Sequence, residues 1–125
     1  WKNTNGMFAI KTDGTLWACG LNSSGQLGDG TTTTRSSPVQ IGSLTDWLNC
    51  KIAAGNNDTR VIKADGTAWA WGRNNQGRLT LGDTTNRSSP TQIGSATDWE
   101  HVSTVSGTTT FLVNTAGKLY VGGRK

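Results

Sequence analysis

Apolar and polar residues alternate in short runs along much of the chain. Phe8–Lys11 leads into the polar stretch Thr12–Thr15 and then into Leu16–Cys19. Alternation with period two is typical of half-buried strands. Asp-Gly between two such runs is a strong hairpin signal, because glycine tolerates the positive φ of a tight turn. Residues 8–19 are therefore predicted to form a β-hairpin that turns at Gly14.

The same pattern returns 52 residues later in the chain. Ile10–Trp47 aligns with Ile62–Trp99 without a gap, and 25 of the 38 aligned positions are identical. A third and shorter copy occupies Phe111–Tyr120. Self-similarity at a fixed period indicates a duplicated structural unit. We divide the chain into a first repeat at 1–58 with an incomplete inner strand at its start, a second repeat at 59–110 and a truncated third repeat at 111–125.

Each repeat continues beyond its hairpin with further predicted elements. A loop rich in glycine and asparagine, Gly20–Gly30, precedes a threonine-rich stretch that ends at Pro38, and Pro90 repeats this position. Proline cannot donate to a ladder, so these stretches read as edge strands. Trp47 then precedes the apolar run Cys50–Gly55. Three or four antiparallel strands per 52 residues predict an all-β fold of propeller blades, a partial ring of roughly 2.4 repeats.

Composition agrees with this fold class. Thr, Gly, Ser and Asn together make up 57 of the 125 residues, and only 33% of residues are apolar. Charged residues contribute 16%, which excludes a helical bundle or coiled coil. The six tryptophans argue against disorder, because disordered chains seldom carry such large apolar groups.

Charge and cysteine content narrow the function classes. The net charge is +4, and the basic residues are scattered singly rather than gathered in a stripe, so nucleic-acid binding is not expected. No apolar run approaches the length of a membrane span. Cys19 and Cys50 lack metal-ligand spacing. We expect two buried thiols, and a disulfide between them is the alternative.

Candidate catalytic and metal-binding residues are few. His101 is the single histidine and is expected to lie on the surface; together with two cysteines it cannot form a zinc site. Asp29 and Asp83 lie beside glycines in polar loops, but their spacing lacks the alternating ligands of a calcium loop. We therefore predict no catalytic residue, no metal and no cofactor, and the binding residues stay unassigned.

Residues that occur in every copy are expected to be architectural. Asp13 and Asp65 should bond their own backbone two residues on. Arg35 and Arg87 should pair with Asp46 or Asp98, or else face an anionic partner. The repeated structural positions are the tryptophans, which should pack blade against blade, the hairpin glycines and the two prolines: Trp17, Trp69, Trp47, Trp99, Gly14, Gly66, Gly117, Pro38 and Pro90.

These repeated segments carry a family resemblance. The run Asp13–Gly20, followed by Asn22–Gly28 and by Arg35–Pro38, resembles the regulator-of-chromosome-condensation repeat, and its bacterial and phage versions especially. The resemblance covers about Asn5 to Gly123. It implies a β-propeller of four-stranded blades that serves mainly in protein–protein contacts. The exchange-factor activity of the eukaryotic member is not carried over, because its working residues have no match here.

The copies differ at a few positions. Cys19 and Gly122 stand where the second copy has Trp71, Thr80 stands at the position of Gly28, and Arg78 stands at the position of Gln26. The blades are therefore expected to pack slightly differently from one another.

The resemblance makes a non-enzymatic interaction scaffold the expected function, as a structural component of a virion or a cell-surface assembly. An extracellular or virion location is favoured on the same ground. A carbohydrate- or receptor-binding propeller is the alternative, because exposed aromatic rings can bind sugars. Both ends are expected to leave blades incomplete, to be completed by a longer chain, by other protein partners or by a homo-oligomer.

Overall fold

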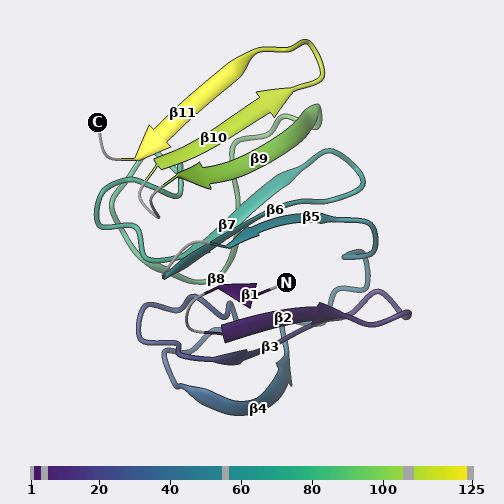
Figure 1. Cartoon of the computed structure of the whole chain (residues 1–125), viewed down its shortest axis with the longest axis vertical. Helices are drawn as coiled ribbons and strands as arrows, with labels where there is room; N and C mark the ends of the chain where they lie inside the picture. The colour runs from purple at the N-terminus through teal and green to yellow at the C-terminus, as the bar shows by residue number, and fades with distance from the viewer. Residues whose placement is uncertain (1, 4–5, 55–56, 106–108, 124–125) are drawn as a thin grey trace.

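The computed structural model describes residues 2–3, 6–54, 57–105 and 109–123. All regular structure within these residues is β, as Figure 1 shows. In chain order the strands are β1 (Lys2–Asn3), β2 (Gly6–Ile10), β3 (Leu16–Gly20), β4 (Arg35–Gln40), β5 (Lys51–Ala54), β6 (Asp58–Ile62), β7 (Ala68–Gly72), β8 (Arg87–Gln92), β9 (Trp99–Val105), β10 (Thr109–Asn114) and β11 (Leu119–Gly123). The described residues hold no helix long and apolar enough to cross a membrane.

The strands form three antiparallel sheets that stand side by side (Figure 1). The first sheet has the order β1-β2-β3-β4 and the second β5-β6-β7-β8. The third has the order β9-β10-β11, without a fourth strand in the part of the chain that the structure describes. Strand β9 packs against β5 and β6, so neighbouring sheets approach along their first strands. The prediction of an all-β fold with about four antiparallel strands per unit is confirmed.

The sheets and the sequence repeats are offset from one another. The second sheet begins with β5, before the repeat at 59–110, and the third begins with β9, before the repeat at 111–125. β5 and β9 each pair with the hairpin that comes after them in the chain. Each therefore belongs to the same sheet as that hairpin, although it lies in the preceding sequence repeat.

The hairpin turns need glycine for two reasons. Gly14 adopts a φ of 87° and donates its N–H to the Lys11 carbonyl at 2.9 Å. A Cβ on Gly14 would also overlap the Thr45 carbonyl oxygen, and one on Gly66 would overlap that of Thr97. The turn must therefore hold a residue that tolerates positive φ and has no side chain.

Carboxylates fix the first two of these turns. Asp13 Oδ1 accepts from the Thr15 N–H at 3.0 Å and from Thr15 Oγ1 at 2.6 Å, and Asp65 repeats both bonds with Thr67. These hydrogen bonds, the threonine hydroxyl first, hold the pKa of both aspartates below the ordinary value. The expected bond to the backbone two residues on is present in both turns.

The third turn reaches the same result with different residues. Ala116 stands at the position of the aspartate and has no carboxylate. Asn114 Oδ1 instead accepts from the N–H groups of Ala116 at 3.1 Å and Lys118 at 2.9 Å. Gly117 adopts a φ of 81°, like the glycines of the other two turns.

Both prolines lie on edge strands of their sheets. Pro38 is in β4 and Pro90 is in β8, and each of these strands is the last of its sheet. A missing N–H costs nothing on the outer side of such a strand.

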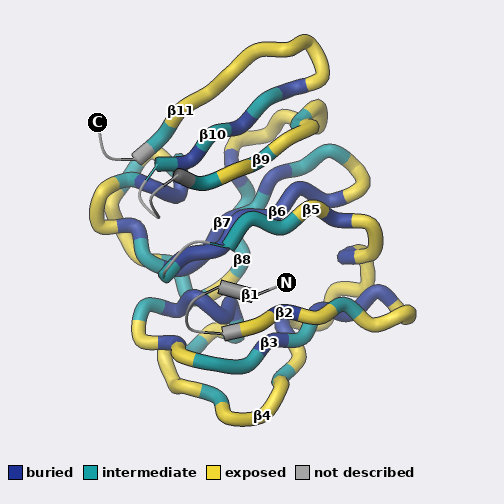
Figure 2. Tube along the Cα trace, viewed as in Figure 1, coloured by how far each residue is buried: buried dark blue, intermediate teal, exposed yellow. Residues whose placement is uncertain are grey.

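The core lies between the sheets. Figure 2 shows buried residues where neighbouring sheets face one another, with exposed residues on β4 and on the turns. One apolar cluster joins the first and second sheets and is composed of Phe8, Leu16, Ala18, Leu27, Ile41, Trp47, Cys50, Val61 and Trp71. A second joins the second and third sheets and is composed of Ile62, Ala68, Ala70, Leu79, Ile93 and Leu112.

Candidate functional site in the contacts between the sheets

Asparagine side chains organise the loops that follow β3 and β7. Asn22 Nδ2 donates to the carbonyls of Thr31 at 2.9 Å and Thr33 at 3.0 Å, while its Oδ1 accepts from the Leu27 N–H at 3.0 Å. Asn74 makes the same set of bonds in the second loop. Both asparagines are fully buried. Each loop is thus held around one amide that uses its donors and its acceptor.

An ion pair closes each loop from the outside. Arg35 Nε lies 2.9 Å from Asp29 Oδ2, and Arg87 forms an ion pair with Asp83. The expected pairing of these arginines with Asp46 or Asp98 is therefore wrong. Arg35 pairs with Asp29, and Arg87 with Asp83, because the loop that carries each aspartate folds back onto the strand that carries the arginine.

The two aspartates occupy different positions in the repeat. Thr31 and Asp83 are equivalent, and the carbonyl of each accepts from the organising asparagine. The carboxylate comes from Asp29 in the first loop and from Asp83 itself in the second, two positions later. The gapless alignment places Asp29 opposite Leu81 and so does not reveal this shared role.

The first loop lies on the second sheet. The Gln26 carbonyl accepts from Trp71 Nε1 at 2.9 Å and from Thr59 Oγ1 at 3.1 Å. Gly28 faces the Trp71 indole so closely that a Cβ would lie 2.9 Å from Nε1. The loop is therefore fixed by hydrogen bonds to its backbone and by the missing side chain of Gly28, which lets the loop approach the indole closely.

The second loop lies on the third sheet in the same way. The Arg78 carbonyl accepts from Thr110 Oγ1 of the third sheet at 2.6 Å and also from Arg60 Nη2 of the second sheet at 3.0 Å. Here Thr80 occupies the place of Gly28 and packs against Gly122. Thr80 keeps a positive φ of 61°, which is uncommon for a β-branched residue.

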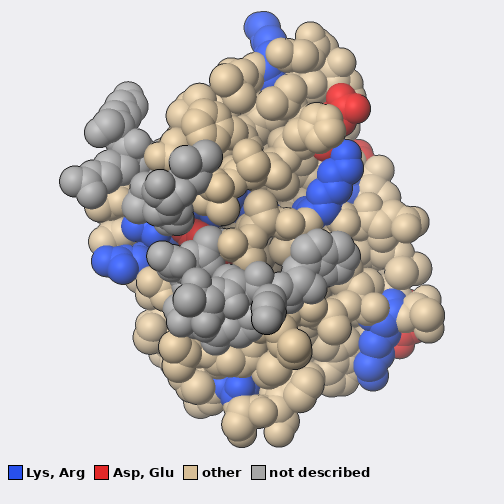
Figure 3. Space-filling view, in the orientation of Figure 1, with Lys and Arg blue, Asp and Glu red and all other residues tan. Residues whose placement is uncertain are grey.

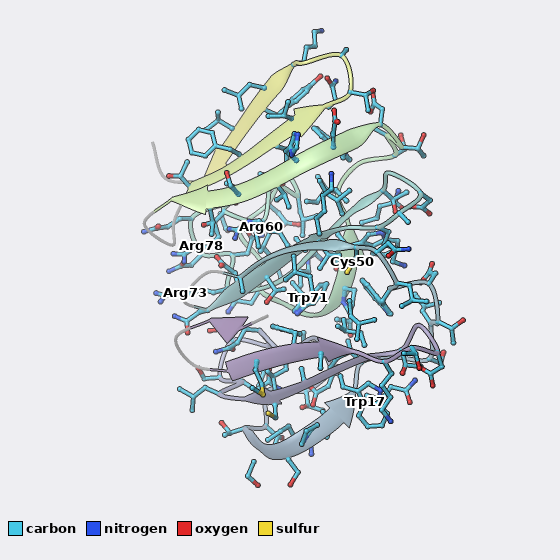
Figure 4. The ribbon with its side chains drawn as sticks, turned by 45° about the vertical axis from the view of Figure 1, so that its right-hand side comes forward. Trp17, Cys50, Arg60, Trp71, Arg73 and Arg78 are labelled. Carbon is cyan, nitrogen blue, oxygen red and sulfur yellow. The ribbon has the colours of Figure 1, made fainter. Side chains whose placement is uncertain are left out.

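Three charged side chains are buried beside this second contact, where Figure 4 shows Arg60 and Arg78 close together. Both terminal nitrogens of Arg60 donate to the Asp58 carboxylate at 3.1 Å, and Arg78 Nη1 lies 3.5 Å from Asp58 Oδ2. Burial lowers the pKa of Arg60, and the Asp58 carboxylate opposes that shift. Two cations thus share one anion among these three side chains.

A lysine lies between two tryptophans in the contact between the first and second sheets. Lys63 Nζ is 4.3 Å from the Trp47 ring centroid and 4.5 Å from that of Trp69, and it lies 3.1 Å from Asp46. The lysine side chain is only 3% exposed. Trp47 also packs edge-to-face on Trp71 at 6.0 Å. Cation–π attraction and the apolar contacts hold the two sheets together here.

The third sheet replaces this arrangement by a direct ring contact. Asn114 stands at the position of Lys63, and Trp99 packs edge-to-face on Tyr120 with centroids 5.0 Å apart. In the first sheet, Trp17 packs within its own sheet, under Lys11 at 4.0 Å and hydrogen-bonded to Thr15.

Candidate residues for chemistry are dispersed. His101 lies exposed in β9. Cys50 is buried, which raises the pKa of its thiol to about 11, and Cys19 is half-buried. Both cysteines are free and form no disulfide with one another, and the expectation of a buried thiol is met at Cys50 but not at Cys19. Among the described residues no three His, Cys, Asp or Glu side chains gather as metal ligands, and no pocket is enclosed.

The charged surface agrees with the scattered basic residues of the sequence. Figure 3 shows Lys and Arg separated by uncharged surface on the visible face. Sequence reasoning missed two sites, the lysine between the tryptophans and the buried Asp58 cluster. A change at three positions together was the signal for the cluster. Asp58, Arg60 and Arg78 of the second repeat replace the uncharged residues Gly6, Phe8 and Gln26 of the first.

Comparison with known proteins agrees with this architecture. Human Protein RCC2 is 39% identical over 85 residues, which cover 67% of this chain and 16% of that protein. The Ultraviolet-B receptor UVR8 of Arabidopsis thaliana is 31% identical over 90 residues, which cover 72% of this chain and 20% of the receptor. The chain thus spans a fifth or less of these relatives. They are eukaryotic proteins and do not support a special closeness to bacterial and phage versions.

Solved structures show the same fold. Human WBSCR16 matches with a TM-score of 0.81 at 23% identity, over 98% of this chain and 31% of that one. Yeast RCC1 (Prp20), in its structure with Kap60, matches with a TM-score of 0.76 at 16% identity, over 95% of this chain and 28% of that one. The three sheets are therefore blades of a β-propeller, two with four strands and the third with three strands among the described residues. The sequence profile of the regulator of chromosome condensation (RCC1) repeat matches residues 13–62 and 65–112, and the chain belongs to this family.

Proposed function

We propose that this chain is a non-enzymatic β-propeller module whose blades form a rigid surface for binding other proteins. The observation that carries the proposal is the use of the repeated polar side chains. Asn22 and Asn74 hold the loops, and the ion pairs of Asp29 and Asp83 close them. Polar side chains with the same role in the first two blades thus serve the framework, and the variable exposed residues are left for recognition.

The structural relatives support a protein partner. Yeast RCC1 (Prp20) was solved bound to Kap60, and another structure of Prp20p is described with its binding properties to Gsp1p and histones. The present chain spans about 30% of those proteins. That it binds protein partners as they do is therefore part of our proposal.

A place in a virion or cell-surface assembly is a finer form of the proposal. It rests on the resemblance to phage and bacterial repeats alone, and the eukaryotic relatives lend it no support.

The carbohydrate-binding alternative depends on exposed aromatic rings. Trp47 and Trp71 are fully buried between blades, which removes two rings from that role. Tyr120 is 46% exposed, and its ring already packs edge-to-face with Trp99. The geometry therefore favours the protein-binding module.

The test is a comparison of two classes of ligand at near-physiological salt. Purified chain is immobilised and exposed to Kap60, Gsp1p and core histones, and separately to a glycan array. We expect saturable binding to at least one protein that survives a threefold rise in salt, which separates recognition from charge attraction. Binding confined to glycans would favour the alternative, and binding to neither class would contradict the proposal.

A further inference from the structure

The buried charges between the second and third blades do not balance. All eight Asp and Glu residues of the chain lie in its described part, and Asp58 is the only one of them that pairs with Arg60 or Arg78. The Asp58 and Arg60 side chains are 0% exposed, and that of Arg78 is 6% exposed. Burial lowers the pKa of Arg60 most, and the charge of Arg78 lowers it further. Acidic side chains thus leave one buried positive charge uncompensated.

The other two blades show that the fold does not need these charges. Strand pairing places Phe8 of β2 and Phe111 of β10 at the position of Arg60. Phe8 is 3% exposed and belongs to the apolar core. A buried charge needs an opposite charge and complete hydrogen bonding, whereas a buried ring needs neither. Arg60 Nε is moreover buried without a hydrogen-bond acceptor in the described part of the chain. Packing alone therefore does not account for the arginines of the second blade.

Gln76 is the side chain through which this cluster meets the solvent. Its Oε1 accepts from Arg78 Nη2 at 3.3 Å, and Gln76 itself is exposed. The contact of Arg78 Nη1 with Asp58 Oδ2 is long, at 3.5 Å. The Arg78 guanidinium thus contacts a neutral amide and a carboxylate that it shares with Arg60. A carboxylate in place of the amide would form a charge-assisted bond, which is roughly twice as strong as a neutral one.

A third arginine lies beside the cluster. Figure 4 shows Arg73 on the same side of the molecule as Arg60 and Arg78. The Arg73 N–H donates to the Asn57 carbonyl at 2.8 Å, next to Asp58 in the chain. Arg73 is half-buried and forms no ion pair with another described residue. Its charge adds to the attraction of this surface for anions.

We propose that Arg78, with Arg73 beside it, binds a carboxylate side chain from an acidic segment of a partner protein. This proposal rests on the function proposed above and names the chemistry of the partner. The partner carboxylate displaces the Gln76 amide and accepts from the Arg78 guanidinium. Asp58 then serves Arg60 alone, whose two terminal nitrogens already donate to it. Each of the two guanidinium groups thereby gains a carboxylate of its own, the partner that its planar fork fits.

The probe is the acetylated and amidated peptide Ser-Gly-Glu-Glu-Glu-Gly-Ser, titrated without a label into the 125-residue chain by calorimetry. The matched control peptide carries glutamine in place of each glutamate, so size is kept and charge is removed. We expect saturable binding of the glutamate peptide with a stoichiometry of one, weakened by added salt. The glutamine peptide should give no heat beyond that of dilution.

Gln76→Glu supplies the carboxylate from within the chain. Glutamate and glutamine have the same length, so the new carboxylate oxygen takes the place of the amide oxygen on Arg78. Peptide binding should weaken by about tenfold or more, and the melting temperature should rise. Ser24→Glu is the matched control, because it adds the same charge at the equivalent position of the first loop, where the neutral Gln26 replaces the arginine. It should change binding by less than about twofold and should not raise the melting temperature.

Arg78→Gln removes the binding group and introduces the residue of the first repeat. Asp58 and Arg60 remain as a balanced pair, so the chain should stay folded, which circular dichroism checks. Peptide binding should weaken by about tenfold or more. Lys118→Gln removes the same charge at an exposed position between β10 and β11 and should change binding by less than about twofold.

Absence of saturable binding would overturn the acidic-segment site. Equal losses of binding for Arg78→Gln and Lys118→Gln would also overturn it, because they would reveal a general attraction to the net charge of +4. The same holds if Gln76→Glu and Ser24→Glu do not differ in binding or in melting temperature. If the chain binds a protein in the test under the proposed function but not the glutamate peptide, only the acidic-segment site fails and the module proposal stands.

Discussion

Thr80 and Gly122 fit together across the contact between the second and third blades, because a Cβ on Gly122 would overlap Thr80 Cγ2. Between the first and second blades the sizes are exchanged, and Gly28 faces the indole of Trp71. A large group meets a small one in each case, which preserves close packing. Two apparent departures from the repeat therefore compensate one another.

We predict that Gly122→Ala destabilises the chain by about 1–3 kcal/mol, because Thr80 must move to admit the methyl group. In a Thr80→Gly background the same substitution should cost well under half as much. Urea unfolding followed by tryptophan fluorescence gives both values. Equal costs in the two backgrounds would show that the two residues are not coupled.

The buried charges should be costly to break and cheap to replace together. Asp58→Ala leaves Arg60 and Arg78 buried without their shared carboxylate and should cost about 3–5 kcal/mol. The combined substitution Asp58→Gly, Arg60→Phe and Arg78→Gln installs the residues of the first repeat and should recover most of that loss. The free energy of unfolding measures both. A triple variant no more stable than Asp58→Ala would contradict this view.

Lys63 and Lys11 offer a matched pair for cation–π contacts. Lys63 is buried between two rings, whereas Lys11 is exposed over Trp17 alone. Lys63→Ala should cost about 2 kcal/mol or more, and Lys11→Ala about 0.5–1 kcal/mol. Thermal and denaturant unfolding of the two variants tests the order. Similar losses of stability for the two variants would show that burial between two rings does not strengthen the contacts of Lys63, which contradicts the prediction.

Acid should weaken the first loop through Asp29. Burial raises the pKa of this carboxyl, but hydrogen bonds from Thr31 and Arg35 outweigh burial and hold the pKa below its ordinary 3.8. A pKa lowered by folding contributes stability above about pH 4, and this contribution is lost as pH falls through the folded value. Asp29→Asn should therefore be less stable than the native chain at pH 7, and the difference should narrow below pH 4. A difference independent of pH would refute the assignment.

The two thiols should react at different rates. Cys50 is buried with its pKa raised to about 11, so little thiolate forms and little reagent reaches it. Cys19 is half-buried. At pH 8 iodoacetamide should modify Cys19 first, and Cys50 only when denaturant is added, as peptide mass mapping can show. Equal labelling in the folded chain would contradict the burial of Cys50.

Much of the fold could be predicted because short segments of the sequence specify its elements. Alternating apolar residues, the Asp-Gly turns and the positions of Pro38 and Pro90 each specify an element without reference to distant residues. Repetition then shows that one unit occurs more than once.

The contacts between blades were harder to foresee. The pairing of Arg35 with Asp29 rather than Asp46 depends on how a loop folds back, which composition and spacing do not reveal. The place of Lys63 between Trp47 and Trp69 depends on residues from two sheets. Long-range side-chain contacts require the relative placement of the sheets, and a single sequence carries no direct record of it.

The loop after β3 contacts a blade that is synthesised after it, so the order of synthesis affects when the loop becomes stable. Among the described residues, the hydrogen-bond donors to its Gln26 carbonyl lie on β6 and β7, which leave the ribosome after it. The loops of the first and second blades therefore gain their hydrogen bonds to the next blade only after that blade has been synthesised. Synthesis from the N-terminus should add stability stepwise, with the newest blade always the least protected from proteases.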